Sequence, residues 1–149
     1  MIDEAGEGSF LEDFGLLLER EGMPRMAGRM LGWLLICDPP HQTAGQLAQV
    51  VGASKASVST TMRLLMHTEL VERITLPSER RDYFRVRPNA ITTLMRSTMG
   101  RLRAGRDLAE RGLRLAHGDP ARVAEWLDLY VFFERELPPL IERWDAERQ

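Results

Sequence analysis

Two helix-start signals lie close together in this chain, at Thr43 and Ser54, and Gly52 stands between them. Thr43 and Gln46 have the spacing of a capping box, in which a side-chain oxygen accepts a hydrogen bond from a backbone N–H of the first helical turn. Gly52 tolerates the left-handed backbone that a tight turn requires. The pattern therefore predicts a short helix, a tight turn, and a second helix from Ser54 to about Thr68.

Two strand-like runs follow this helical pair. The first covers residues 70–76 and is rich in β-branched side chains, and the second covers residues 83–86. The polar stretch 77–82 separates them, so the pattern predicts a β-hairpin. A helix, a tight turn, a second helix and a hairpin in this order are typical of a winged helix-turn-helix.

The apolar positions of the helical pair predict which faces are buried. Anchors recur at helical spacing at Leu47, Val51, Val58, Met62 and Leu65, with Thr61 as a less apolar anchor. The opposite face of the second helix is then short, polar and basic, as a helix entering the major groove of DNA needs to be. The predicted double-stranded DNA-binding surface comprises Thr43, Ser54, Lys55, Ala56, Ser57, Ser59, Thr60, Arg63, Arg80 and Arg81.

Each member of this surface also has a simpler interpretation. Lys55 and Arg63 are consistent with solvated surface charges, and the hydroxyls with ordinary surface side chains. The two arginines of the hairpin turn are consistent with ion pairs to Glu79 and Asp82. In the DNA-binding interpretation, Arg63 offers a two-pronged donor to guanine or pairs with a phosphate, and the turn arginines suit the backbone or a narrow minor groove.

Net charge alone does not indicate a nucleic-acid-binding chain, because it is −2. The distribution is more informative: residues 1–30 hold seven acidic and three basic side chains, whereas residues 54–87 hold seven basic and four acidic ones. The alternative function is a winged-helix module that binds protein rather than DNA, which the net charge and the acidic N-terminal stretch favour. Salt-sensitive binding to duplex DNA distinguishes the two.

Two helices are predicted ahead of the winged region. Ser9 and Glu12 have the spacing of a capping box, so the first helix is expected to begin there. Pro24 suits the first turn of the second helix, because its missing N–H would have no partner there in any case. Gly28 and Gly32 are expected to let a neighbouring backbone approach that helix closely.

Two long helices are predicted after the winged region. The first opens at Asn89 as a cap, and the second follows an Asp119 cap. Pro138 and Pro139 are expected to kink or split the second helix, because both remove donors and clash with the preceding turn. Small side chains recur along one face of the first helix, at Gly105, Ala109, Gly112 and Ala116. We expect this stripe to allow a close crossing with another helix; a cavity for an effector is the alternative.

The chain is therefore expected to be mainly α-helical with a small β-hairpin wing. Residues 1–36 would form N-terminal helices for dimerisation and support, 37–88 the winged helix-turn-helix, and 89–149 a C-terminal helical dimerisation region. The long helices offer more apolar surface than a monomer hides, so a homodimer is predicted. Candidates for its intersubunit core, for each of which intrachain packing is the alternative, are Leu11, Phe14, Leu18, Trp126, Tyr130, Phe133 and Leu137.

An aromatic effector pocket is a further prediction. Aromatic faces attract cations such as quaternary ammonium groups, although aromatic residues at helical spacing usually belong to a core. The candidate lining residues are Trp33, Trp126, Tyr130 and Trp144.

Enzyme signatures are missing from the sequence. The histidines are scattered, and no nucleophile elbow, phosphate loop or dinucleotide fingerprint occurs, so neither an enzyme nor a metal or other cofactor is predicted. The single cysteine, Cys37, has no basic neighbour, which favours an inert buried thiol over a redox switch. One cysteine, an acidic N-terminus and no apolar run long enough to cross a bilayer favour a cytoplasmic protein that does not contact membranes.

Several ordered motifs resemble the GbsR branch of the MarR superfamily of bacterial transcription regulators. The resemblance covers roughly residues 10–90. Its segments are residues 22–32 (GMPRMAGRMLG), 35–40, 47–48, 54–59 (SKASVS), 63–65, 70–73 (LVER) and 80–84 (RRDYF). One departure is the hairpin turn, where Ser78 and Glu79 stand in place of the glycine of this branch. Residues 90–149 resemble the family only in being helical.

The resemblance implies a homodimer whose terminal helices form the interface. It also implies that paired winged modules bind a pseudo-palindromic operator, and that a small ligand modulates repression or activation. It does not identify the ligand, the operator or the regulated genes.

Overall fold

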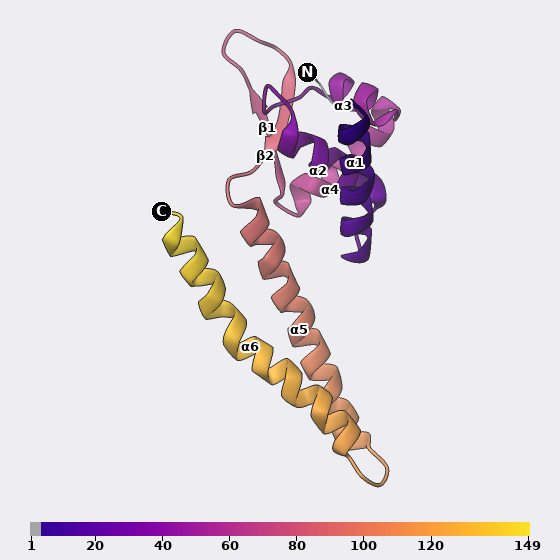
Figure 1. The fold of residues 1–149 in the computed structure, drawn as a ribbon, viewed down its shortest axis with the longest axis vertical. Helices are drawn as coiled ribbons and strands as arrows, with labels where there is room; N and C mark the ends of the chain where they lie inside the picture. The colour runs from indigo at the N-terminus through magenta and orange to yellow at the C-terminus, as the bar shows by residue number, and fades with distance from the viewer. Residues whose placement is uncertain (1–3) are drawn as a thin grey trace. The chain divides into compact units, whose positions relative to one another are not determined.

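The structure, a computed structural model, describes residues 4–149 of the 149-residue chain, and the chain divides into two compact units, residues 1–90 and 91–149 (Figure 1). Residues 1–3 of the predicted N-terminal region 1–36 lie outside the described residues. The elements in chain order are α1 (Glu4–Arg20), α2 (Arg25–Ile36), α3 (Ala44–Val51), α4 (Lys55–His67), β1 (Val71–Thr75), β2 (Asp82–Val86), α5 (Ala90–Leu115) and α6 (Ala121–Glu147).

Helices α1 and α2 cross with their backbones in close approach. A Cβ added to Gly28 would lie 2.7 Å from the Cα of Gly15 and 2.7 Å from the carbonyl oxygen of Phe14. The close approach predicted from Gly28 is therefore confirmed, and α1 is the neighbour. The predicted start of α1 at Ser9 is wrong, because α1 already begins at Glu4 and Ser9 lies inside the helix.

The helical pair α3 and α4 follows the predicted signals. Thr43 Oγ1 accepts from the Gln46 N–H at 3.1 Å, and the Gln46 side chain accepts from the Thr43 N–H at 2.8 Å, which completes the capping box. Gly52 ends α3 in the left-handed conformation with φ 65°. Ser54 then caps α4 by accepting from the Ser57 N–H at 3.1 Å.

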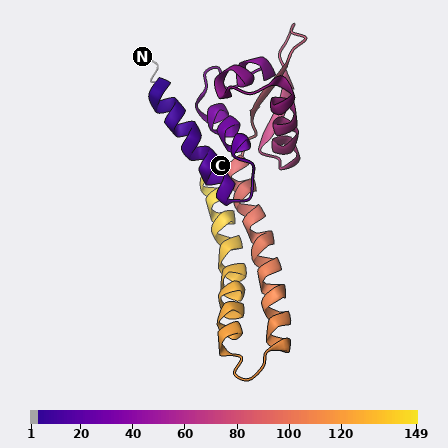
Figure 2. The same cartoon turned by 90° about the vertical axis from the view of Figure 1, so that its right-hand side faces the viewer.

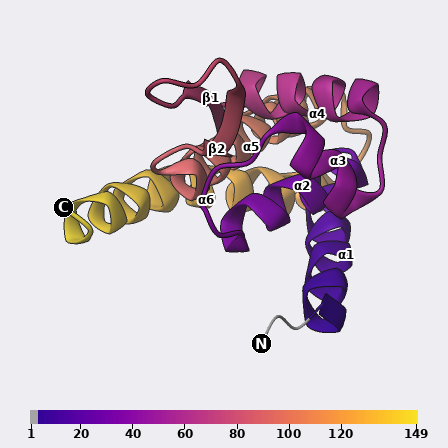
Figure 3. The same ribbon diagram turned by 90° about the horizontal axis from the view of Figure 1, so that it is seen from above.

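The hairpin is a two-stranded antiparallel sheet in which Arg73 pairs with Phe84 and Thr75 with Asp82. The backbone of Gln42 extends this sheet by one isolated bridge, since Phe84 N–H donates to the Gln42 carbonyl at 2.8 Å and Gln42 N–H donates to the Phe84 carbonyl at 2.9 Å. Figure 3 shows α3 and α4 beside the hairpin. Ser78 in the turn has φ 65°, a left-handed conformation that glycine adopts more easily than serine.

A closed hydrophobic core holds the first unit together. Its fully buried side chains come from helices α1 to α4 and from the start of the hairpin, which is why six short elements suffice to enclose it. All six predicted anchors of α3 and α4 are buried: Leu47, Val51, Val58, Thr61, Met62 and Leu65.

In the second unit, α5 and α6 lie side by side and antiparallel (Figure 2). A Cβ added to Gly105 would lie 2.5 Å from Cζ of Tyr130, and one added to Gly112 would lie 3.2 Å from Cγ2 of Val123. Ala109 between them is buried. Three of the four predicted small residues therefore serve a close helix crossing, and α6 is the partner. Ala116 does not, because it lies beyond the end of α5 and is exposed.

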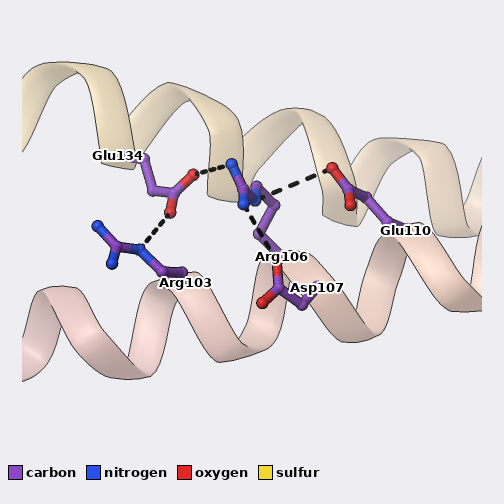
Figure 4. A network of polar contacts seen from close by, with 5 residues as sticks. All are labelled: Arg103, Arg106, Asp107, Glu110 and Glu134. Carbon is purple, nitrogen blue, oxygen red and sulfur yellow. Dashed lines mark hydrogen bonds and ion pairs between the residues drawn. The ribbon is translucent and has the colours of Figure 1, made fainter.

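Ion pairs join α5 and α6 at two levels of this antiparallel helix pair. Glu134 of α6 pairs with Arg106 at 3.1 Å and with Arg103 at 3.8 Å, both from α5 (Figure 4). Nearer the chain terminus, Asp145 of α6 accepts from Arg96 at 2.7 Å and from the Thr92 hydroxyl at 3.1 Å.

Helix α6 begins and continues as a single element. The predicted cap residue Asp119 accepts from the Ala121 N–H at 3.0 Å, although Pro120, and not Asp119, is the residue directly before the helix. The helix runs through Pro138 and Pro139 to Glu147, so of the two predicted alternatives the split does not occur and the kink stays a prediction. Within the described residues, no helix is long and apolar enough to cross a membrane.

Candidate nucleic-acid interface

Helix α4 presents one polar face outward because its apolar residues face the core. Val58, Met62 and Leu65 are fully buried. Between these anchors, the side chains of Lys55, Ala56, Ser59, Thr60 and Arg63 are exposed, together with the capping residue Ser54, while Ser57 is half-buried. The structure therefore places the predicted helix residues on one accessible face.

The basic side chains of this face are not neutralised by neighbouring acids. Arg63 Nε donates to the Ser59 carbonyl at 3.4 Å, one turn earlier on α4. Between residues 4 and 149, no hydrogen bond or ion pair engages Lys55, Arg80 or Arg81. Their charges are thus available to a polyanion.

The alternative pairing of the turn arginines is not what the structure shows. Glu79 accepts a hydrogen bond from the Tyr83 hydroxyl, and Asp82 pairs with Arg73 at 3.8 Å. The hydrogen bond to Glu79 raises the pKa of the Tyr83 phenol above its usual range. Arg80 and Arg81 are both exposed in the turn.

A hollow of about 410 Å³ joins the start of α3, the start of α4 and the hairpin. Four residues of the predicted DNA-binding set line it: Thr43, Lys55, Ser59 and Arg81. Five further residues that sequence reasoning did not select also line it: Ala44, Gly45, Arg73, Asp82 and Phe84. Only the pairing of β1 with β2 brings Arg73 there, a signal that local sequence does not carry.

The predicted dimer residues divide into two groups. Leu11 and Leu18 are 4% and 1% exposed and Phe14 is half-buried, so the assignment of the two leucines to an intersubunit core is corrected: a partner has almost no surface left to cover on them. In α6, Trp126 is 64% exposed, Phe133 is exposed, and Tyr130 and Leu137 are half-buried.

The three residues of the predicted effector pocket that lie on α6 do not line one common hollow. Trp126 and Tyr130 lie with ring centroids 6.4 Å apart and line a hollow of about 610 Å³ with Phe133, Glu125 and Asp128. Trp144 lies about five turns further along α6 and lines a different hollow.

The remaining residue of the predicted effector pocket, Trp33, belongs to the first unit, where it binds the segment that pairs with β2. Its indole N–H donates to the Gln42 side chain at 3.1 Å, and Gln42 itself is buried. This engagement supports a packing role for Trp33.

Cys37 is buried just after α2, and its thiol faces the Leu34 carbonyl at 3.8 Å. Burial raises the pKa of this thiol, so the reactive thiolate is disfavoured. Within residues 4–149, no cluster of three or more His, Cys, Asp or Glu residues has the arrangement of a metal site.

Comparison with known proteins identifies the family. The chain is 36% identical over 139 residues to the HTH-type transcriptional regulator MmpR5 of Mycobacterium tuberculosis, a match that covers 91% of this chain and 84% of the relative. The family model for an MmpR5-like MarR family transcriptional regulator matches residues 89–147. This chain belongs to the MmpR5-like MarR family of transcriptional regulators.

A solved structure supports the same assignment for this MarR-family chain. A crystal structure of a transcriptional regulator superimposes with a TM-score of 0.73 at 34% sequence identity, covering 95% of this chain and 99% of that one. The predicted winged fold, the resemblance to the MarR superfamily and the expectation of a non-enzyme are thereby confirmed. The family match over residues 89–147 was not foreseen, because that region resembled the family only in being helical.

Proposed function

We propose that this MarR-family regulator is a cytoplasmic homodimer that binds double-stranded DNA in a sequence-specific manner. Helix α4 enters the major groove, and the hairpin turn follows the backbone or the adjacent minor groove. The observation that carries this proposal is the outward face of α4: Lys55, Ser59 and Arg63 are exposed while the opposite side of the helix is fully buried. A helix held in this way can approach base edges without disturbing the hydrophobic core of the first unit.

The homodimer follows from the apolar surface of the second unit. Trp126, Phe133 and Leu140 recur at seven-residue spacing on α6 and are all exposed, which is the repeat of a helix that packs against another helix. Exposed Leu16 and Leu17 of α1 offer further apolar surface. A second copy is the partner that supplies a matching apolar face. Two winged units would then bind half-sites of a pseudo-palindrome about 10 base pairs apart, or a multiple of that spacing.

A small effector is part of the same proposal. The hollow beside Trp126 and Tyr130 combines aromatic faces with the carboxylates of Glu125 and Asp128, which suits an organic cation such as a quaternary ammonium. Quenching of tryptophan fluorescence by a lipophilic quaternary ammonium, lost in Tyr130→Ala, tests it. Membership of the GbsR branch remains a prediction from the motif resemblance.

The DNA-binding proposal is tested with a labelled duplex of mixed sequence and with operator fragments selected from the source genome. Wild-type binding should weaken steeply as salt rises, because Lys and Arg displace counterions from phosphates. Arg63→Ala should weaken operator binding by about 1–3 kcal/mol if Arg63 contacts a base. The matched control is Arg111→Ala, which removes an exposed arginine of α5.

Two outcomes would overturn the assignment. If Arg63→Ala and the double variant Arg80→Ala/Arg81→Ala both bind the operator like wild type, the proposed surface is wrong. If the wild type shows no salt-sensitive DNA binding at all, a winged-helix module that binds protein becomes the better explanation.

A further inference from the structure

The hollow between α3, α4 and the hairpin gathers unbalanced positive charge. Lys55, Arg73 and Arg81 line it, and Asp82 is its single acidic lining residue. Hydroxyl groups of Thr43 and Ser59 complete the polar lining. Three cations against one carboxylate favour an anionic occupant.

Strand register directs Arg73 to this hollow. Arg73 is the cross-strand partner of Phe84, so both side chains lie on the same face of the hairpin, the face that buries Phe84. Asp82 lies two residues from Phe84 and shares that face. Glu72 and Arg85 pair with each other on the opposite face.

The two arginines of the strands, Arg73 in β1 and Arg85 in β2, differ in how far their charges are neutralised. Arg85 Nε lies 2.6 Å from Glu72 Oε1, within hydrogen-bonding distance. Arg73 Nη1 lies 3.8 Å from Asp82 Oδ2, and both side chains are about half exposed, which makes the pair weak. The Arg73 guanidinium also lies 5.7 Å from the centroid of the Phe84 ring, which orients it without neutralising it.

Resting on the DNA-binding function proposed above, we propose that this hollow binds one phosphate of the DNA backbone, with Arg73 as its principal ligand. Lys55 and Arg81 add charge, and Ala44 and Gly45 contribute the first-turn N–H groups of α3, which have no carbonyl partner within the helix. Asp82 opposes the phosphate and limits the affinity for DNA of any sequence. The bound phosphate fixes the distance between α4 and the hairpin, and so positions Arg63 and the turn arginines on the duplex.

The test measures the affinity of the full-length chain for a labelled duplex of mixed sequence over a series of salt concentrations. Arg73→Ala should weaken binding on the order of tenfold at low salt and reduce the slope of log K against log salt by about 0.9, the value for one lost phosphate contact. Arg73→Lys keeps the charge and should retain the slope. Asp82→Asn should tighten binding by about threefold, because it removes the opposing charge.

Two matched variants separate a local site from a general charge effect. Arg73→Ala/Asp82→Asn leaves the net charge of the chain unchanged and should still lower the slope. Arg85→Ala removes an equally placed arginine from the opposite face of the hairpin and should leave the slope as in wild type. A slope that falls equally in Arg85→Ala and Arg73→Ala would overturn the proposal, as would an unchanged slope in Arg73→Ala.

Folding of each variant is checked by thermal unfolding followed by circular dichroism. If Arg73→Ala does not fold, the affinity of Asp82→Asn for the duplex is the deciding measurement. An affinity of Asp82→Asn equal to that of wild type overturns the phosphate site. If the wild type binds DNA in a salt-sensitive manner but Arg73→Ala has the wild-type slope, only this inference is refuted. No salt-sensitive binding by the wild type refutes the proposed function together with it.

Discussion

Helices of residues 4–90 enclose a core of fully buried aliphatic side chains, whereas the α5–α6 hairpin leaves most of its large apolar side chains exposed. Leu18, Leu47 and Met62 in the first unit have almost no accessible surface. Across Ala121–Glu147, all of which the structure describes, α6 has no buried residue. Both units are rich in apolar residues, so the difference lies in the number of elements available to cover them.

This contrast shows what a two-helix hairpin lacks. Four helices and a small sheet can surround a common interior, but two antiparallel helices cover only one side of each other. The first unit therefore has a buried core of its own, whereas the second unit presents an apolar face that the proposed second copy would cover. The predictions below test this division, beginning with the largest expected effect.

Matched leucine truncations compare the two units directly. Leu65→Ala in α4 removes a side chain with 0% exposure and should lower the free energy of unfolding by about 2–5 kcal/mol, because it leaves a cavity. Leu108→Ala in α5, where the side chain is 60% exposed, should cost less than about 0.5 kcal/mol. Urea denaturation of both variants gives the comparison, and equal losses would show that the second unit has a core of its own.

Phe133→Arg asks whether a second copy covers α6. A charged side chain on the exposed apolar face should weaken self-association by about 2 kcal/mol or more, close to thirtyfold, while residues 4–90 keep their fold. Sedimentation equilibrium over a range of concentrations measures it. Phe133→Leu is the control and should retain most of the association; a wild type that is monomeric at every concentration would refute the dimer.

Two glycines of α5 test the contact within the hairpin. Gly105→Ala places a methyl group against the Tyr130 ring and should destabilise the chain by about 1–3 kcal/mol. Gly100 has no heavy atom within 4 Å of an added Cβ, so Gly100→Ala should instead stabilise it by about 0.4–1 kcal/mol. Thermal unfolding of both variants distinguishes them, and stabilisation by Gly105→Ala as well as by Gly100→Ala would mean that the helices do not meet at Gly105.

The smallest expected effect is the alkaline pH dependence due to Cys37. Burial raises the pKa of this thiol in the folded chain, so the unfolded chain loses the proton first. The contribution to stability is complete below the unfolded pKa of about 8.5 and is lost as pH rises through the folded value. Urea denaturation at several pH values should show a shallower alkaline decline in Cys37→Ala. An identical decline would show that the thiol ionises equally in both states.

Local signals predicted the winged region because their chemistry is completed within a few residues. Thr43 and Gln46 satisfy each other's backbone groups, and Gly52 supplies the left-handed turn by itself. The same capping spacing was misleading at Ser9. The residues before Ser9 are helical, so the N–H groups that a cap would bind already lie inside α1. A capping box therefore predicts a helix start only where the preceding residues cannot be helical.

Other features depend on contacts between distant residues and could not be predicted. Helical periodicity marked Leu11 and Leu18 as apolar, but only the crossing with α2 decides that they are buried within the chain. Arg73 enters the candidate site through its pairing with Phe84 across the hairpin. The aromatic residues of α6 share one helix, yet its length keeps Trp126 and Trp144 apart.

The paired prolines of α6 give that helix a defined point of weakness. Pro138 and Pro139 have no N–H to donate, so the carbonyls of Glu134 and Arg135 lose their partners one turn earlier. Two consecutive rungs of the hydrogen-bond ladder are missing, at the level where the Glu134 carboxylate engages α5. Bending of α6 therefore costs least at this point, which lies between the Glu134–Arg106 ion pair and the Asp145–Arg96 ion pair that hold the helix to α5.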